Sequence, residues 1–268
     1  MRSYTGIEDL TVALDGAVLS VTFNRPDSLN SLTTAMLTTL ADSLEQASDD
    51  PAVKVIRLGG AGRGFCAGAG ISAEDQAVAR AALDSELDPL LAAANRAVRT
   101  IVDLPKPVVA VVHGPAAGVG VSLALACDVV LAAETAFFLL AFTRIGLMPD
   151  GGATALVAAA VGRARAMAMA LLAERLPAAE AFSHGLVSSV HPAGELESVA
   201  ASVIEKLAAG PAIALRQTKQ AINAATLTEL DDAIDRETTG QLKLLHTRDF
   251  AEGTRAFQER RPAVFTDS

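Results

Sequence analysis

The stretch LPKPVVAVVHGPAAGVGVSLALACD, residues 104–128, decides the fold. Its β-branched run at residues 108–112 follows two prolines and predicts a buried strand, and the small residues after it predict a turn into a helix. The first amides of a helix lack internal partners and lie at the positive end of its dipole. The start of the predicted helix can therefore bind a phosphate, or an oxygen that becomes negative during a reaction. Alternatively, Gly118 and Gly120 serve only to pack the helix closely on the sheet.

Composition narrows the class of protein. The chain has 268 residues, of which 51% are hydrophobic and 20% charged, with a formal net charge of -9. We expect a globular protein that binds neither nucleic acid nor an anionic membrane, because basic residues are not clustered. The start of the chain lacks a signal-peptide pattern and the Ala-rich segments are interrupted by charge or proline, so we expect a cytoplasmic protein. Cys66 and Cys127 fit neither a metal motif nor a disulfide framework, which favours buried thiols.

The first 71 residues alternate strands with other elements. Leu10–Leu14 and Ala17–Phe23 flank Asp15-Gly16 and predict an antiparallel hairpin. Thr33–Ala47 has the apolar spacing of an amphipathic helix, and Val53–Leu58 predicts the next strand. The loop GGAGRGFCAGAGI, residues 59–71, follows that strand and lacks the Gly-Lys-Ser/Thr of a Walker loop. Such a loop is either a linker or, at the end of a buried strand, a place where α/β sheets bind ligands.

The rest of the chain turns from mixed structure to helices. Ala73–Asp103 is mostly helical by pattern with a break at Asp88-Pro89, Val129–Ala132 predicts a strand, and the apolar patch Phe137–Phe142 leaves its type open. Further helices are predicted over Ala153–Val161, Ala164–Glu174, Glu195–Ala209, Ala212–Ala225, Leu230–Leu245 and Asp249–Arg261. We therefore expect an α/β core over residues 1–193 and an all-helical region over residues 194–268.

Several motifs together resemble those of a known family. They are Asn24-Arg25-Pro26 with Leu29-Asn30, GRGFCAGAGI, KPVVAVVHGPAAGVGVSLALACD, RIGLMPDGGAT, HGLV and FQERRPAVF, in this order over nearly the whole chain. The sequence resembles the crotonase superfamily, the enoyl-CoA hydratase and isomerase family. The resemblance implies a spiral core of ββα units, and a helical C-terminal region that packs trimers or pairs of trimers. It also implies an acyl-CoA or enoyl-CoA substrate, with coenzyme A as part of the substrate and neither metal nor redox cofactor.

The resemblance also assigns an oxyanion hole. Members of the family hold the thioester oxygen with two backbone amides, which correspond here to Ala69 and Val119, while Gly118 gives room. Paired N–H donors aimed at an oxygen stabilise an enolate more than a neutral carbonyl. The resemblance also places residues along the path of the bound CoA. They are Ala67, Gly68, Gly70, Ile71, Phe257 and Arg260, of which the last two often reach a site across a subunit boundary. Arg260 can equally be a solvated charge at a helix end.

Two departures from the family pattern argue against the usual hydratase mechanism. Hydratases of the family carry two glutamates that act on the attacking water, and those positions here hold Ser122 and Phe142. Neither side chain replaces a carboxylate in acid-base catalysis. Ser122 either orients the substrate or fills the helix face. The Asp that commonly follows the first oxyanion amide in the family is replaced here by Gly70, which leaves the amide in place.

Asp150 is the remaining candidate for the acid-base group. It ends Ile-Gly-Leu-Met-Pro-Asp at residues 145–150, a turn that supplies the active carboxylate in several non-hydratase members. Enclosure by apolar side chains such as Phe142 and Met148 raises a carboxyl pKa. Asp150 is otherwise an N-cap of the helix that follows, and His113 is interpreted as structural. We expect isomerisation through an enolate in fatty-acid or related acyl-CoA metabolism. The alternatives are a hydratase with a non-standard acid and a non-catalytic acyl-CoA binder.

Overall fold

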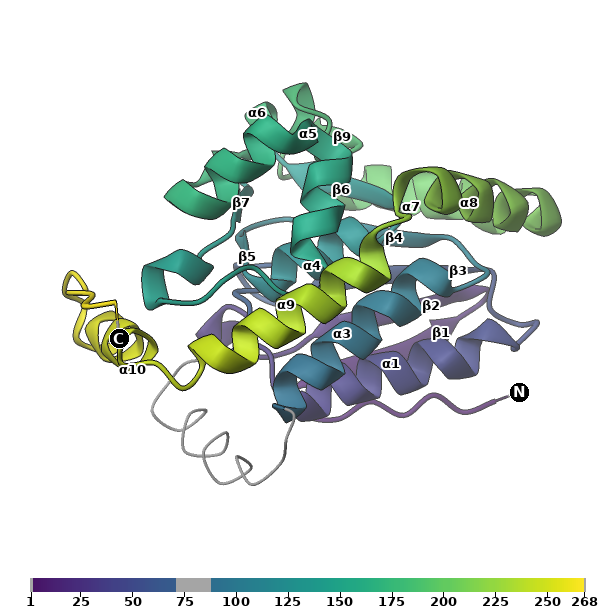
Figure 1. Ribbon diagram of the computed structural model, residues 1–268. Coiled ribbons are helices and arrows are strands. Elements are labelled where there is room, and N and C mark those ends of the chain that lie inside the picture. The colour runs from purple at the N-terminus through teal and green to yellow at the C-terminus, as the bar shows by residue number, and fades with distance from the viewer. Residues whose placement is uncertain (1, 71–87, 268) are drawn as a thin grey trace.

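A six-stranded sheet forms the centre of the computed structural model, which describes residues 2–70 and 88–267 (Figure 1). The first two strands pair antiparallel, with Leu10 opposite Phe23, and the other neighbours pair parallel. All five residues of the middle strand β4 are buried, as its unbroken apolar sequence predicts. In sheet order the strands are β1 (Leu10–Asp15), β2 (Val18–Phe23), β3 (Val55–Gly60), β4 (Val108–Val112), β6 (Val129–Ala133) and β9 (Ser189–His191).

A smaller sheet lies at the ends of these strands and shapes the turn before the organising helix. It consists of β5 (Ala116–Ala117), β7 (Phe137–Leu139) and β8 (Leu176–Pro177), with β5 parallel and β8 antiparallel to β7. The Gly118 amide donates to the Leu139 carbonyl at 2.9 Å, which extends the pairing by one residue. The apolar patch Phe137–Phe142, whose secondary structure the sequence left undecided, thus forms strand β7 followed by the 3-10 helix η2 (Phe142–Ile145).

Helices cover the sheet and make up most of the chain after β9. Figure 1 shows α1, α3 and α9 side by side, and α3 is tied to α9 by a hydrogen bond of 2.9 Å from Asn95 Nδ2 to Thr238 Oγ1. The 3-10 helix η1 (Pro26–Ser28) precedes α1. The helices are α1 (Thr34–Ser48), α3 (Pro89–Asp103), α4 (Val119–Ala126), α5 (Ala153–Leu172), α6 (Ala178–Ser183), α7 (Leu196–Ala208), α8 (Ala212–Thr226), α9 (Leu230–Leu244) and α10 (Arg248–Glu259).

The order of elements confirms the expected α/β core followed by helices. The predicted hairpin, the Thr33 start of α1 and the four C-terminal helices are present within a few residues of their expected bounds. The two helices predicted around Gly162 form one element, α5, whose helical geometry is interrupted at that glycine. The first part of the predicted helix over Ala73–Asp103 lies outside the described residues, and its second part is α3, beginning after the Asp88 N-cap.

Helix α5 is unusually apolar for its exposure. An 18-residue window of it has a mean hydropathy of 1.6, yet only 17% of that window is buried. Among the described helices taken singly, it alone is long and apolar enough to cross a membrane. Leu171 and Leu172 near its end are 62% and 63% exposed. The single chain therefore leaves an apolar helix surface uncovered.

Candidate active site

The glycine-rich loop after β3 is held in place by the buried side chain of Asn30. Its Nδ2 donates to the carbonyls of Ala61 and Gly64 at 2.9 and 2.7 Å, and its Oδ1 accepts from the Arg25 amide at 2.9 Å. Asn30 is fully buried, so these bonds form away from water, where an unmade bond is costly. The side chain thus fixes the loop from inside. Sequence reasoning noticed Asn30 as part of a motif and gave it no role.

The loop also pairs with the turn after β4, which brings two glycines face to face. Cys66 forms a parallel bridge with Ala116, and the Ala117 amide donates to the Cys66 carbonyl at 2.8 Å. A Cβ on Gly68 would lie 2.8 Å from the Ala117 carbonyl oxygen, closer than real Cβ atoms come. Gly68 and Gly118 both have positive φ, +88° and +54°. Glycine is therefore required at Gly68 by the close approach and by its positive φ, and is favoured at Gly118 by its positive φ.

The two predicted oxyanion amides follow these glycines directly. Leu32 pairs with Gly68 and Gly70, on either side of Ala69, and N–H groups alternate along an extended chain, so the Ala69 N–H points the other way. Val119 is the first residue of α4, where a helix leaves its N–H without an internal partner. Across residues 2–70 and 88–267, neither amide makes a hydrogen bond. Two unsatisfied donors thus stand on adjoining segments, the arrangement that stabilises a developing oxyanion.

Asp150 lies beside this pair on a turn that packs against α4. Its carbonyl accepts a 2.9 Å hydrogen bond from Ser122 Oγ, one turn along α4 from Val119. A Cβ on Gly151 would lie 3.3 Å from Ser122 Oγ and 3.6 Å from Val119 Cγ1. The candidate carboxylate is therefore anchored to the helix that carries the second oxyanion amide. The Ser122 hydroxyl thus holds this turn, and its role in orienting a substrate stays a prediction.

The interpretation of Asp150 as a helix cap is wrong. The N-cap of α5 is Gly152, without a side-chain cap; the Ala153 amide donates to the Asp150 backbone carbonyl, and a side-chain acceptor for its neighbours comes from Glu237 on α9. Its carboxylate accepts from the amides of Gly152 and Thr154 at 2.7 and 2.8 Å, and from the Thr154 hydroxyl. Because the helix is capped from a distant segment, the Asp150 side chain is available for another role.

The carboxyl group of Asp150 is buried and partly unsatisfied. The side chain is 7% exposed, Oδ2 accepts a 2.6 Å hydrogen bond from Gln241 Nε2, and Oδ1 has no partner among the described residues. Burial raises the pKa of Asp150 to about 7, the hydrogen bond from Gln241 lowers it, and the charges of Glu237 and Asp88 raise it. The raised pKa that was expected from enclosure of this carboxyl group is therefore present. A carboxyl with a pKa near neutrality can both take and return a proton.

Comparison with known proteins identifies the family. A family model described as enoyl-CoA hydratase/isomerase matches residues 14–268. The chain belongs to the enoyl-CoA hydratase/isomerase family. Among curated relatives, the 1,2-epoxyphenylacetyl-CoA isomerase of Escherichia coli (strain K12) is 38% identical over 94% of this chain and 96% of its own length. The probable enoyl-CoA hydratase of Rhodobacter capsulatus is 41% identical over 92% and 93% of the two chains.

Solved structures agree with this assignment. The crystal structure of an enoyl-CoA hydratase from Mycobacterium avium subsp. paratuberculosis K-10 has a TM-score of 0.91 and 61% sequence identity, and the match covers 98% of this chain and all of that one. The crotonase-like α/β fold with a helical C-terminal region, expected from the sequence motifs, is thereby confirmed.

The positions that hold two glutamates in hydratases of the family carry no carboxylate here. The first is Ser122, fully buried and bonded to the Asp150 carbonyl. The second is Phe142, 7% exposed, whose Cζ would lie 3.8 Å from a Cβ on Gly118. A phenyl ring thus sits next to the second oxyanion amide. Within the described residues, no three His, Cys, Asp or Glu side chains form a group that could hold a metal.

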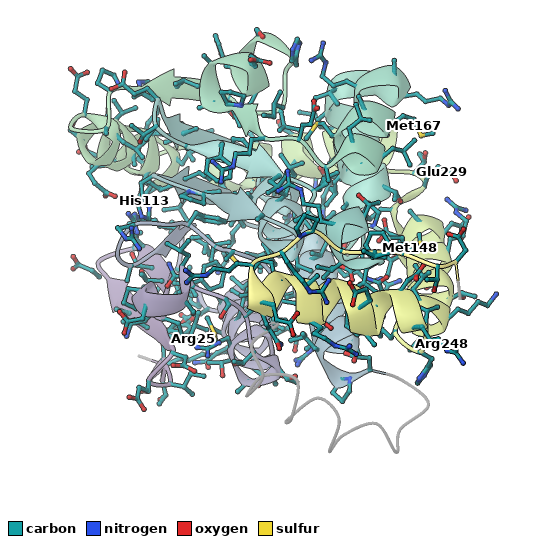
Figure 2. The ribbon with its side chains drawn as sticks, turned by 90° about the vertical axis from the view of Figure 1, so that its left-hand side faces the viewer. Arg25, His113, Met148, Met167, Glu229 and Arg248 are labelled. Carbon is teal, nitrogen blue, oxygen red and sulfur yellow. The ribbon has the colours of Figure 1, made fainter. Side chains whose placement is uncertain are left out.

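The other predicted site residues divide between the loop and α10. Ala67, Gly68 and Gly70 lie on the glycine-rich loop after β3, and Ile71 falls outside the described residues. Phe257 on α10 is 61% exposed and Arg260 ends that helix as its C-cap, so neither is enclosed within the single chain. His113 Nε2 lies 3.0 Å from the Gly62 carbonyl oxygen, which supports its structural interpretation. Figure 2 shows His113 on the opposite side of the view from Met148, two residues before Asp150.

The acidic and amide groups of α9 were missed by the sequence analysis. Glu237 and Gln241 continue the apolar spacing of Leu230 and Ile234, so all four occupy the buried side of the helix. Polar residues on the apolar stripe of a helix are the signal that could have found them, because a buried polar group needs a partner.

Proposed function

We propose that the protein isomerises an enoyl-CoA by moving a proton through an enolate, with Asp150 as the proton carrier and the amides of Ala69 and Val119 as the oxyanion hole. The observation that carries this proposal is the buried carboxyl group of Asp150, with a pKa of about 7, on a turn that packs against helix α4, whose first residue carries the Val119 amide. The name of the 1,2-epoxyphenylacetyl-CoA isomerase relative supports an isomerase activity.

The proposed reaction needs one base and one anion-stabilising site. The ionised Asp150 takes the C2 proton of a 3-enoyl thioester, and the C–H electron pair moves into the dienolate, whose oxygen accepts bonds from both amides. The same carboxyl exchanges its proton with solvent and then delivers a proton at C4, which yields the 2-enoyl thioester and regenerates the carboxylate. Each oxyanion donor contributes about 3 kcal/mol of transition-state stabilisation, and a positioned acid-base group contributes about 10²- to 10⁴-fold in rate.

Hydration is the second candidate function. Relatives named as probable enoyl-CoA hydratases favour it, and a carboxyl with a pKa near 7 can also deliver a proton to an enolate during water addition. The absence of carboxylates at Ser122 and Phe142 weighs against it, because the two-glutamate mechanism requires both. A non-catalytic acyl-CoA binder keeps the oxyanion hole and lacks the proton transfer.

The proposal includes coenzyme A as part of the substrate, no metal or redox cofactor, and a cytoplasmic protein without nucleic-acid or membrane partners. It also includes assembly as a trimer or a dimer of trimers. The exposed apolar surface of α5 supports self-association, because uncovered apolar surface of this extent usually marks an interface. Exposed Phe257 and Arg260 then reach a CoA bound to a neighbouring copy.

The test is incubation with 3-enoyl-CoA and 2-enoyl-CoA in D₂O, followed by mass spectrometry of both thioesters. Interconversion of the two double-bond isomers, with deuterium at carbon, supports isomerisation. Gain of the mass of one water supports the hydratase candidate and contradicts the proposal. Binding by calorimetry without isotope uptake or turnover identifies a non-catalytic binder.

A further inference from the structure

Helix α9 presents two buried polar side chains to the turn that carries Asp150, and the proposed reaction uses neither directly. Glu237 is 1% exposed and Gln241 is 2% exposed. They lie one helical turn apart, and both reach the segment between Met148 and Thr154. The C-terminal helical region therefore supplies part of the surroundings of the candidate base.

Gln241 makes three hydrogen bonds, and together they fix which way its amide points. Nε2 donates to Asp150 Oδ2 at 2.6 Å and to the Met148 carbonyl at 3.1 Å, while Oε1 accepts from the Met148 amide at 3.2 Å. Rotating the amide by half a turn would set its oxygen against two acceptors and its nitrogen against a donor. The backbone of Met148 thus aims the Gln241 nitrogen at Asp150.

This geometry makes the two oxygens of Asp150 unequal. Oδ2 is occupied by the Gln241 donor, whereas Oδ1 is buried without a hydrogen-bond partner among the described residues. An oxygen that accepts a bond from an N–H holds negative charge well, and the other oxygen is where a proton adds.

We propose that Gln241 is a positioning residue that occupies Oδ2 of Asp150 and so reserves Oδ1 as the oxygen that carries the transferred proton. The catalytic part of this assignment rests on the proposed isomerase function. The preference for Oδ1 is a property of the substrate-free protein.

Among the described residues, the other charged groups whose charges act on Asp150 are both acidic. Glu237 approaches from α9 and Asp88 from the start of α3, and their negative charges favour the protonated carboxyl. Burial acts in the same direction, so the Gln241 hydrogen bond is the interaction that opposes them. Without Gln241, Asp150 is expected to stay protonated at neutral pH, and a protonated carboxyl cannot act as a base.

The test compares Gln241→Leu and Gln241→Glu with a control on the same helix, Thr238→Val. Thr238 Oγ1 accepts from Asn95 on α3 and donates to the Ile234 carbonyl, so the control loosens the docking of α9 without removing the Gln241 donor. The readout is the infrared titration of the Asp150 carboxyl in substrate-free protein, identified by its loss in Asp150→Asn. Loss of a hydrogen bond to a charged group raises the titration midpoint by about one to two pH units.

The expected result is an upward shift in both Gln241 variants and an unchanged midpoint in Thr238→Val. Gln241→Glu keeps the size of the side chain, and its own ionisation gives the pair two apparent midpoints, the upper one above that of the wild type. Wild-type midpoints in both variants would overturn the proposal, as would an equal shift in the control. If Asp150→Asn keeps full isotope exchange, the isomerase function fails while the infrared titration still decides the role of Gln241.

Discussion

Replacement of Asp150 by asparagine should make the protein more stable at alkaline pH. The wild-type carboxyl has a pKa of about 7 in the folded state, against a model value of 3.8. Below pH 4 the group is protonated in both states and leaves stability unaffected. Between these values only the unfolded chain ionises, so the wild type loses stability as pH rises, and the loss is complete above pH 7.

The magnitude follows from the size of the shift. The folded and unfolded pKa values differ by about three units, each unit corresponds to about 1.4 kcal/mol, and the penalty above pH 7 is therefore about 4 kcal/mol per chain. Asparagine has nearly the same shape and stays neutral, so Asp150→Asn escapes the penalty. Its stability relative to the wild type should rise by about this amount between pH 4 and pH 8.

Urea denaturation of both proteins at several pH values and one chain concentration measures this difference. The use of a difference between two variants cancels the titration of distant groups. A gap in the free energy of unfolding that is the same at pH 4.5 and pH 8 would refute the assignment of a raised pKa to Asp150.

Three further predictions concern the surroundings of the site. Gly118→Ala should lower the free energy of unfolding by about 1–3 kcal/mol, because the φ of +54° at this position strains any residue other than glycine. It should also slow isotope exchange, because relief of that strain shifts the Val119 amide. Urea denaturation measures the first effect and the rate of exchange measures the second. Glu237→Gln should lower the pKa of Asp150 and move the acid limb of the exchange profile to lower pH, and an upward shift would contradict the charge assignment. Lys219→Met should cost about 1.5–3 kcal/mol in urea denaturation, because it removes the buried ammonium group that lies 3.0 Å from the partly exposed Asp128 carboxylate; a loss below 1 kcal/mol would count against this.

The sequence predicted best those elements whose signals are local. Residues 108–112 form a strand with the expected bounds, because a β-branched run after prolines has few other conformations available. The amides of Ala69 and Val119 were predicted through motifs as the oxyanion donors. The structure adds a physical reason, since the pairing of Leu32 with Gly68 and Gly70 and the start of α4 leave both N–H groups without a partner among residues 2–70 and 88–267.

The role of Asp150 could not be settled from neighbouring residues. An aspartate shortly before an apolar helical run usually caps that helix. Here Glu237, 85 positions after Gly152, supplies the capping acceptor, and Gln241 donates a hydrogen bond to the Asp150 carboxyl group. Such contacts between distant segments leave only a weak trace in sequence, polar residues on the buried stripe of α9.

The central claim, that Asp150 carries the proton, is tested most directly by the rate of deuterium uptake into a 3-enoyl-CoA by the wild type and by Asp150→Asn. Calorimetry with the same thioester provides the control for binding. The account predicts that the variant keeps the affinity of the wild type and loses about 10²- to 10⁴-fold in the rate of uptake. An undiminished rate in Asp150→Asn would contradict it.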